Sequence, residues 1–317
     1  MSSAPIQLRQ LIPIVKLSKP GSTQHFSDRL AAAIEREDVA AGIFLFPALL
    51  ILGVFLAFPI IYLGYLSFTG GSFTRAGVHW VGVKNYLRLL LTPDFWQVIG
   101  NTLYFTIGTV LPSIAIPLGL AVLLVGNLAF TGIFRTIYFI PSIVSLVAAG
   151  LGFRWLFQVD GAINQLLGNV GIEKIAWLSD SFWAMPVIIL LSVWKQIGFN
   201  LVVFLAGLQA IPRNRYEAAE LDGANKWQQF RYITWPGMRS TLIFAAITTT
   251  IFTLKSFEQV YVITGGGPLN STNLLVYYIY DRAFAQFDFG YAAAAAMVLL
   301  AFTAGLVYLQ LQTSTQE

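Results

Sequence analysis

The sequence has no cysteine and little charge. Without a thiol, a disulfide framework, a catalytic cysteine and a cysteine-based metal site are excluded. Only 11% of the 317 residues are charged, against roughly 25% in an average soluble domain. The two histidines, His25 and His79, lie too far apart for a local metal motif. These shortages argue against a soluble enzyme and a nucleic-acid binder, and we expect no catalytic, cofactor-binding or metal-binding residue in this chain.

The sequence also lacks Gly-Lys-Ser and Gly-Lys-Thr, one of which must end a phosphate-binding P-loop. The glycine run at residues 264–268 (TGGGP) is therefore interpreted as a tight turn that uses glycine's freedom at positive φ. The chain cannot hydrolyse ATP by P-loop chemistry.

What the sequence has in abundance is apolar residues, which make up 56% of the chain and give a mean hydropathy of +0.69. They gather in six segments, each long enough for a membrane-spanning helix of about 20 residues. The predicted spans are residues 41–68, 101–126, 134–157, 182–208, 241–262 and 290–311. Strands of a membrane barrel would alternate in polarity, and these segments do not. The sequence thus predicts an all-α membrane protein with about six transmembrane helices.

The segments outside the spans define the remaining domain boundaries. We expect an N-terminal tail at residues 1–40, a transmembrane domain at 41–311 and a short C-terminal tail at 312–317. Residues 28–38 of the first tail could form a short surface helix.

The basic residues are distributed unequally between the two sides of the predicted bundle. One side carries eleven of them: Arg9, Lys16, Lys19, Arg29, Arg36, Arg135, Arg213, Arg215, Lys226, Arg231 and Arg239. The other side carries five: Arg75, Lys84, Arg88, Lys174 and Arg282. Because cytoplasmic loops are enriched in Lys and Arg, we expect both termini and the loop at 209–240 to be cytoplasmic.

The loop at residues 211–238 is polar and has its own pattern. Pro212 disfavours helix at the residue before it, so the preceding span is expected to end there. Residues 215–221 predict a short helix, and Gly223 can adopt the left-handed conformation that closes it. Asn225 is a suitable cap for a second short helix running to about Ile233. Two short helices joined by a glycine turn would form a compact protruding element.

Six residues of this loop stand at fixed spacing: Glu217, Ala218, Ala219, Gly223, Ile233 and Pro236. The pattern resembles the EAA loop of ABC importer permeases, EAA-x3-G-x9-I-x-L-P, with Trp235 in place of the usual Leu. The resemblance implies the type I importer permease fold and a coupling loop at 212–236 that docks onto a separate ATP-binding subunit. Glu217 would be the polar contact, Ala218 and Ala219 the closely packed face, and Gly223 the turn. An ion pair between Glu217 and Arg213, four residues earlier, is the structural alternative.

Other short stretches resemble the carbohydrate branch of these permeases. They are residues 80–86 (WVGVKNY), 205–212 (LAGLQAIP), and 264–268 (TGGGP) followed by 278–280 (YIY). The resemblance implies a bacterial inner-membrane subunit that imports a sugar, oligosaccharide or polyol. It also implies a second homologous permease, two ATP-binding subunits that hold ATP and Mg, and an extracytoplasmic solute-binding protein.

Charged and polar side chains inside the predicted spans are candidates for a solute path, because such groups are costly in a bilayer. The candidates are Lys195, Gln196, Asn200, Lys255 and Glu258. Lys255 and Glu258, three apart on the fifth predicted span, could instead pair on one helical face. An ion-coupled secondary transporter is the alternative function, and Glu258 is the only acidic residue well within a predicted span that would serve it.

Overall fold

The computed structural model describes the backbone of residues 37–71, 77, 79–124 and 131–315. These residues belong to two compact units, Met1–Ile61 and Tyr62–Glu317. The surface helix expected at 28–38 lies outside the described residues, apart from residues 37 and 38, which begin a longer helix.

The described part of the first unit is one apolar helical segment. It comprises α2 (Glu37–Leu52), the π-helical turn η1 (Gly53–Ala57) and the start of α3 (Phe58–Ser67), which continues into the second unit. Large apolar side chains on it are exposed, for example Phe44 at 80% and Phe55 at 77%. A helix that is apolar on all sides suits a lipid environment, and residues Phe44–Ser67 are long enough to span a bilayer.

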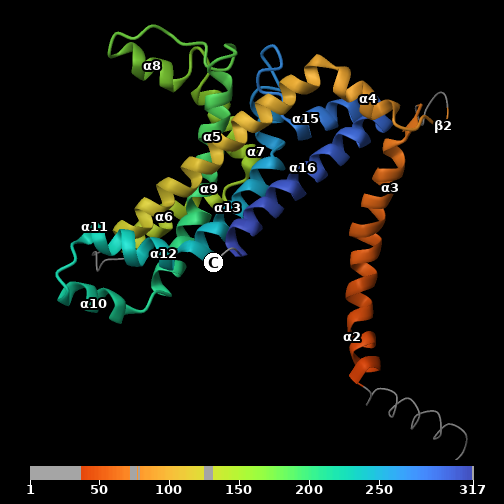
Figure 1. Cartoon of the computed structure of the whole chain (residues 1–317). Helices are drawn as coiled ribbons and strands as arrows, with labels where there is room; N and C mark the ends of the chain where they lie inside the picture. Colours follow the sequence, from red (N-terminus) through yellow and green to blue (C-terminus); the bar gives the residue numbers. More distant parts are fainter. Residues whose placement is uncertain (1–36, 72–76, 78, 125–130, 316–317) are drawn as a thin grey trace, which may run out of the picture. The chain divides into compact units, whose positions relative to one another are not determined.

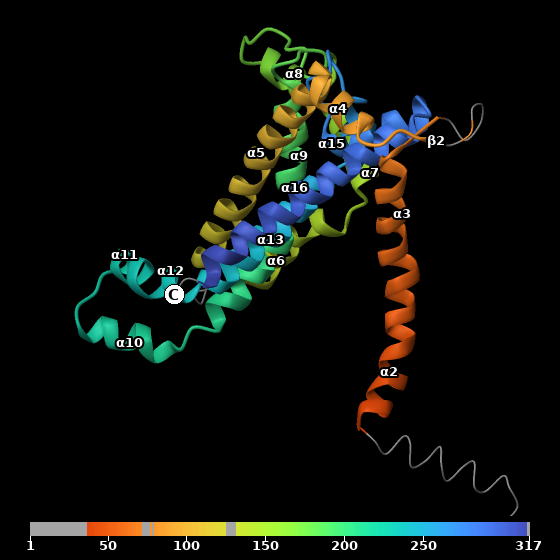
Figure 2. The same cartoon turned by 45° about the vertical axis from the view of Figure 1, so that its right-hand side comes forward.

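The second unit is a helical bundle (Figures 1 and 2). Its further helices are α4 (Lys84–Leu91), α5 (Pro93–Leu124), α6 (Thr131–Ile143), α7 (Leu146–Leu156), α8 (Ala162–Gly168), α9 (Ala184–Gln209), α10 (Arg213–Leu221), α11 (Lys226–Gln229), α12 (Trp235–Gly237), α13 (Arg239–Leu254), α14 (Glu258–Ile263), α15 (Leu275–Tyr280) and α16 (Phe289–Thr315). Two further π-helical segments are η2 (Phe230–Thr234) and η3 (Asp281–Ala285). Strands β1 (Thr69–Gly70) and β2 (His79–Trp80) pair antiparallel.

The long helices α5, α9, α13 and α16 form the body of this bundle, with α10–α12 at one end and α8 at the other (Figure 1). The predicted number of spans agrees with the described chain, which has four helices able to cross a membrane and two bent pairs that could each make one more. The second span is longer than expected and begins at Pro93. Proline suits the first helical position because the amide there has no partner to lose.

The third span is broken, and the prediction of one continuous helix over 134–157 is wrong. Helix α6 ends at Ile143 and α7 begins at Leu146, and their axes differ by 101°. Pro141 cannot donate a backbone hydrogen bond in the last turn of α6. Ser145 then adopts an extended conformation (ψ 132°) and starts α7 in a new direction.

The fifth span is also shorter than predicted. Helix α13 ends at Leu254, and a separate short helix, α14, follows from Glu258. Lys255 caps the end of α13. Lys255 and Glu258 were expected on one helix, and the structure separates them. In the part of the chain that the structure describes, no salt bridge joins them.

The core around α9 depends on close helix contacts. Phe204, Leu201 and Met238 are almost fully buried in a cluster that joins α5, α9 and α13. Gly207 faces Thr241, where an added Cβ would lie 2.6 Å from the Thr241 hydroxyl oxygen. Small residues at such crossings let membrane helices approach closely. This packing holds the loop that follows α9 against the start of α13.

Candidate coupling element

The first half of the predicted coupling loop is a capped helix. Pro212, in an extended conformation (ψ 131°), precedes α10. At its other end Gly223 has φ +76°. The amide of Gly223 donates to the Glu220 carbonyl (3.1 Å), and the amide of Ala224 donates to the Ala219 carbonyl (2.8 Å). These two bonds form a Schellman C-cap, which requires the left-handed residue that glycine supplies. The predicted glycine turn is confirmed.

The second half begins with a capping box. The Asn225 side chain accepts from the Gln228 amide (2.9 Å), and the Gln228 side chain accepts from the Asn225 amide (2.8 Å). These reciprocal bonds satisfy two backbone donors that a helix start leaves free. The predicted cap at Asn225 is therefore confirmed, and the helix runs through η2 and α12 to Gly237. At Met238 the chain bends by 63° into α13.

Polar contacts tie the two halves together. Lys226 donates to the Glu220 carboxylate across the turn (2.8 Å). This bond, with a longer one from Gln229 (3.4 Å), holds the pKa of Glu220 below its ordinary value. Tyr216 and Thr234 share a hydroxyl–hydroxyl bond of 2.9 Å between α10 and η2. The element is thus a defined unit joined directly to α13.

The six pattern residues take different positions on this element. Glu217 and Ala218 are exposed on α10, and Ala219 is half-buried. Ile233 packs against the α9 core, while Pro236 is exposed at the bend before α13. Among the described residues, Glu217 has no salt-bridge partner, so the alternative pairing with Arg213 is not formed. Glu217 and Ala218 are open to a contact from outside the chain.

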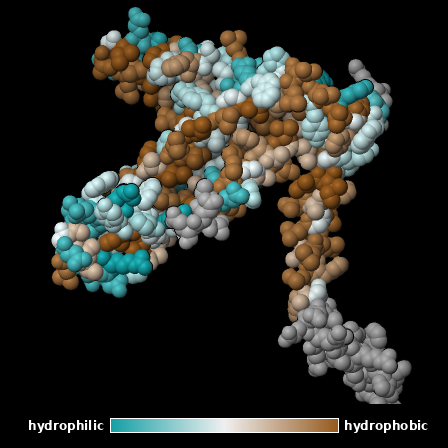
Figure 3. Space-filling view, in the orientation of Figure 1, coloured by the Kyte–Doolittle hydropathy of each residue, from teal (hydrophilic) through white to brown (hydrophobic). Residues whose placement is uncertain are grey.

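Sequence reasoning missed three exposed apolar side chains on this element. Leu221 is 90% exposed, Tyr232 74% and Trp227 70%. They belong to α10, α11 and η2. Polar residues gather at this end of the second unit, in contrast to the apolar surface of the spans (Figure 3). Their large apolar side chains in an otherwise polar loop were the available signal. Like Glu217, they are exposed, and exposed aromatic and apolar side chains beside polar ones are typical of protein interfaces.

Lys195, a candidate for the solute path, lies at the break of the third span, and its role in a solute path stays a prediction. Its ammonium group donates to the backbone carbonyls of Pro141 (2.8 Å), Ser142 (3.1 Å) and Val144. A helix end leaves its last carbonyls without intrahelical partners. Two of the three acceptors lie in the last turn of α6 and the third directly follows it, and a lysine has three donors to match them. Lys195 on α9 therefore caps the broken end of α6.

Asn200 and Gln196, also on α9, face other helices. Asn200 is fully buried and donates to the Ser113 carbonyl (2.6 Å) and the Thr249 hydroxyl (3.1 Å). Gln196 donates to the Thr253 hydroxyl at 3.4 Å. These bonds explain why the side chains are stable within a span, and a role in a solute path stays a prediction. Lys255 and Glu258 are exposed, and the same prediction stands untested for them.

The fold and its protruding end define a multi-pass membrane protein with a capped two-helix element next to its fifth span. The chain belongs to the family described as "Binding-protein-dependent transport system inner membrane component", whose sequence profile matches residues 102–314. This confirms the resemblance to importer permeases.

Curated relatives cover most of the chain. It is 38% identical to the "Lactose transport system permease protein LacF" of Rhizobium radiobacter, over 88% of this chain and 95% of that protein. It is 37% identical to the "Sulfoquinovosyl glycerol transport system permease protein SmoG" of Agrobacterium fabrum, over 83% of this chain and 86% of the relative. It is 34% identical to the "Arabinooligosaccharides transport system permease protein AraP" of Halalkalibacterium halodurans, over 86% and 87% respectively.

A solved structure shares the fold. A chain from the crystal structure of "a bacterial ABC transporter involved in the import of the acidic polysaccharide alginate" superposes with a TM-score of 0.79. The match covers 91% of this chain and 100% of that one at 23% identity. The expected importer permease fold is confirmed.

Proposed function

We propose that this chain is one membrane-spanning subunit of an ATP-driven, binding-protein-dependent importer in a bacterial inner membrane. It would pair with a second, homologous permease to enclose the solute path. Two ATP-binding subunits, holding ATP and Mg, would bind on the cytoplasmic side, and a solute-binding protein would deliver cargo from outside. This chain has no P-loop of its own, so the energy would enter through those partners.

The observation that carries the proposal is the exposed, doubly capped element formed by α10–α12. Its Schellman turn and capping box fix the helix directions, and Glu217, Leu221 and Trp227 are exposed on it. A surface that is already folded loses little conformational entropy when it binds a partner. Because α12 leads into α13 through a single bend, movement of a bound ATPase would be transmitted to a membrane span.

The cargo we infer is a sugar, an oligosaccharide or a related polyol. The printed names of the lactose, sulfoquinovosyl glycerol and arabinooligosaccharide relatives support this class. They do not agree on one sugar, so the proposal is limited to the class.

The alternative function, an ion-coupled secondary transporter, is weakened because Glu258, its candidate ion-binding residue, lies outside the described spans. Such transporters use ionisable groups inside the membrane. Glu258 begins α14, after the fifth span has ended at Leu254. Within the described candidate spans, the one acidic side chain is Asp94 in the first turn of α5. No carboxylate near the middle of a described span would bind a coupling ion.

The test is ATPase activity stimulated by the binding protein, measured on the reconstituted complex with wild type and Glu217→Ala. We expect the variant to assemble and lose most of the stimulation, because an exposed polar contact to the ATPase is removed. Gln312→Ala, which removes an exposed polar side chain at the end of α16 and outside α10–α12, is the control and should keep wild-type stimulation. Normal coupled transport in both Glu217→Ala and Gly223→Pro would contradict the docking role and revive the alternative.

A further inference from the structure

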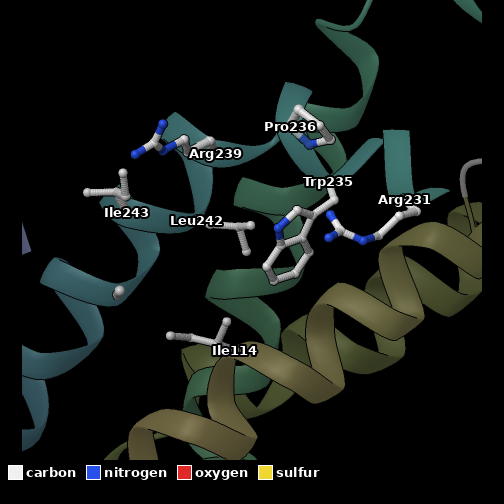
Figure 4. Close-up of a pocket in the computed structure, with 8 residues that line it drawn as sticks. Ile114, Arg231, Trp235, Pro236, Arg239, Leu242 and Ile243 are labelled. Atoms are coloured by element: carbon white, nitrogen blue, oxygen red, sulfur yellow. The ribbon is translucent and has the colours of Figure 1, made fainter. Parts of the chain in front are cut away.

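A groove of about 670 Å³ lies beside the bend between α12 and α13. Arg231 and Arg239 line it from opposite sides of the bend, and the Trp235 ring lies between them (Figure 4). Its apolar wall is formed by Ile114 of α5 and by Leu242 and Ile243 of α13. The groove therefore has a cationic part next to the loop and an apolar part along two spans.

No carboxylate of the described residues neutralises the Arg231 side chain. It is exposed, and among the described residues no aspartate or glutamate oxygen lies within salt-bridge distance of it. Lys226, five residues earlier in the same element, has such a partner in Glu220. An arginine side chain presents a planar set of donors that matches a phosphate, and it is weakly hydrated compared with an ammonium group. The local charge thus favours an anion, and a phosphate matches the donor geometry.

The position of the groove further limits which kind of anion fits it. Trp235 stands where the polar element meets the fifth span, and tryptophan is enriched at the membrane–water boundary. Ile114, Leu242 and Ile243 belong to segments that are long and apolar enough to cross the membrane. A ligand that fills the whole groove must be anionic at one end and apolar along its length. A free anion would leave the apolar wall uncovered.

We propose that this groove binds an anionic phospholipid. Its phosphodiester lies against Arg231, Arg239 adds positive charge on the other side of Trp235, and an acyl chain covers Ile114, Leu242 and Ile243. Basic pockets at the ends of membrane spans attract anionic headgroups in this way. The lipid would hold the bend at Met238, where the loop element passes into α13. This site does not depend on the transported solute or on the importer assignment.

The experiment measures quenching of Trp235 fluorescence by brominated phosphatidylglycerol in phosphatidylcholine vesicles, with the full-length chain reconstituted together with the subunits that accompany it. The contribution of Trp235 is obtained by subtracting the fluorescence of a Trp235→Phe variant from that of the protein. A Trp235→Phe partner is prepared for each arginine variant. We expect Arg231→Gln to lower the apparent affinity for phosphatidylglycerol about fivefold, and Arg231→Gln with Arg239→Gln about 25-fold. Arg215→Gln, an exposed arginine on α10 outside the groove, is the control and should bind like the wild type.

Four results would overturn the proposal. Equal quenching by brominated phosphatidylcholine would show an apolar groove without headgroup selection. Unchanged affinity in the double arginine variant would place the lipid elsewhere, and no quenching by either lipid would show that another protein covers the groove. Competition by excess inorganic phosphate as strong as that by unlabelled phosphatidylglycerol would show a free-anion site. Native mass spectrometry of the same variants, counting retained phosphatidylglycerol, checks the result without the Trp235 substitution.

Discussion

At the residue scale, Asn200 compensates for a proline on another helix. Pro117 cannot donate to the carbonyl four residues earlier in α5, which belongs to Ser113. The buried Asn200 amide donates to that carbonyl at 2.6 Å. A backbone carbonyl without a partner is expensive in the low-dielectric interior, so the amide and the proline form one arrangement across two helices.

We predict that Asn200→Leu destabilises the folded chain by about 1–2 kcal/mol, a range typical of stronger hydrogen bonds between membrane helices. Unfolding in mixed micelles with increasing SDS measures this free energy. Pro117→Ala supplies an amide to the Ser113 carbonyl, so Asn200→Leu should cost less in that background. A double-mutant cycle with no interaction between the two positions would contradict the explanation.

Lys195 makes a second prediction at this scale. Lys195→Met removes all three bonds to the broken end of α6, and the break should open more often. The chain has no native cysteine, so Ala149→Cys, at a buried position in α7, is a clean reporter of opening. We expect thiol labelling at least about tenfold faster in Lys195→Met, because hydrogen bonds to a charged group are worth about 1.5–3 kcal/mol.

The control for this measurement is Lys255→Met. It removes an exposed lysine that lies outside the contact between α6 and α9, so labelling should stay at the wild-type rate. Equal acceleration in both variants would mean that charge loss, and not loss of the cap, loosens the bundle.

At the element scale, the turn between α10 and α11 should respond to acid. Its Glu220 pKa is lowered from 4.5 by the bond to Lys226, so the pair stabilises the turn above that pH. The stabilisation is lost as pH falls through the lowered pKa. Hydrogen exchange of the Gly223 and Ala224 amides, corrected for intrinsic rates, should therefore accelerate in acid. Glu220→Gln carries no titrating charge at this position, and an identical acid response in that variant would contradict the assignment.

The sequence predicted this element well because its determinants are local. Pro212, Gly223 and Asn225 each act on backbone groups within a few residues, and the structure has the turn and the cap at those positions. The number of apolar segments was also predictable, because bilayer thickness sets the length of a span.

The breaks in the spans could not be predicted from local sequence in the same way. Apolar composition is the same on both sides of residues 144–145, and the break is stabilised by Lys195, about fifty positions later in the chain. The role of Asn200 likewise needs a proline on another helix. Polar residues in spans were therefore found from the sequence, but their partners depend on helix packing.

At the scale of the whole molecule, the charge distribution predicts orientation. The predicted topology assigns eleven basic residues to the side that carries the loop at 209–240, against five to the other, so the α10–α12 end should be cytoplasmic and the α8 end outside. The absence of native cysteine allows a direct test with single-cysteine variants. Leu221→Cys at the α10 end is 90% exposed, and Val170→Cys, two residues beyond α8, is 72% exposed.

In right-side-out membrane vesicles, a membrane-impermeant maleimide should label Val170→Cys and leave Leu221→Cys unlabelled until the membrane is dissolved in SDS. Dissolving the membrane also removes any subunit that covers Leu221, so full labelling at that stage shows that the cysteine itself is reactive. The reversed pattern would place α10–α12 outside the cell, where no ATP-binding subunit could reach Glu217. Because docking requires the predicted orientation, this labelling result decides whether the ATPase measurements on Glu217→Ala can be interpreted as coupling.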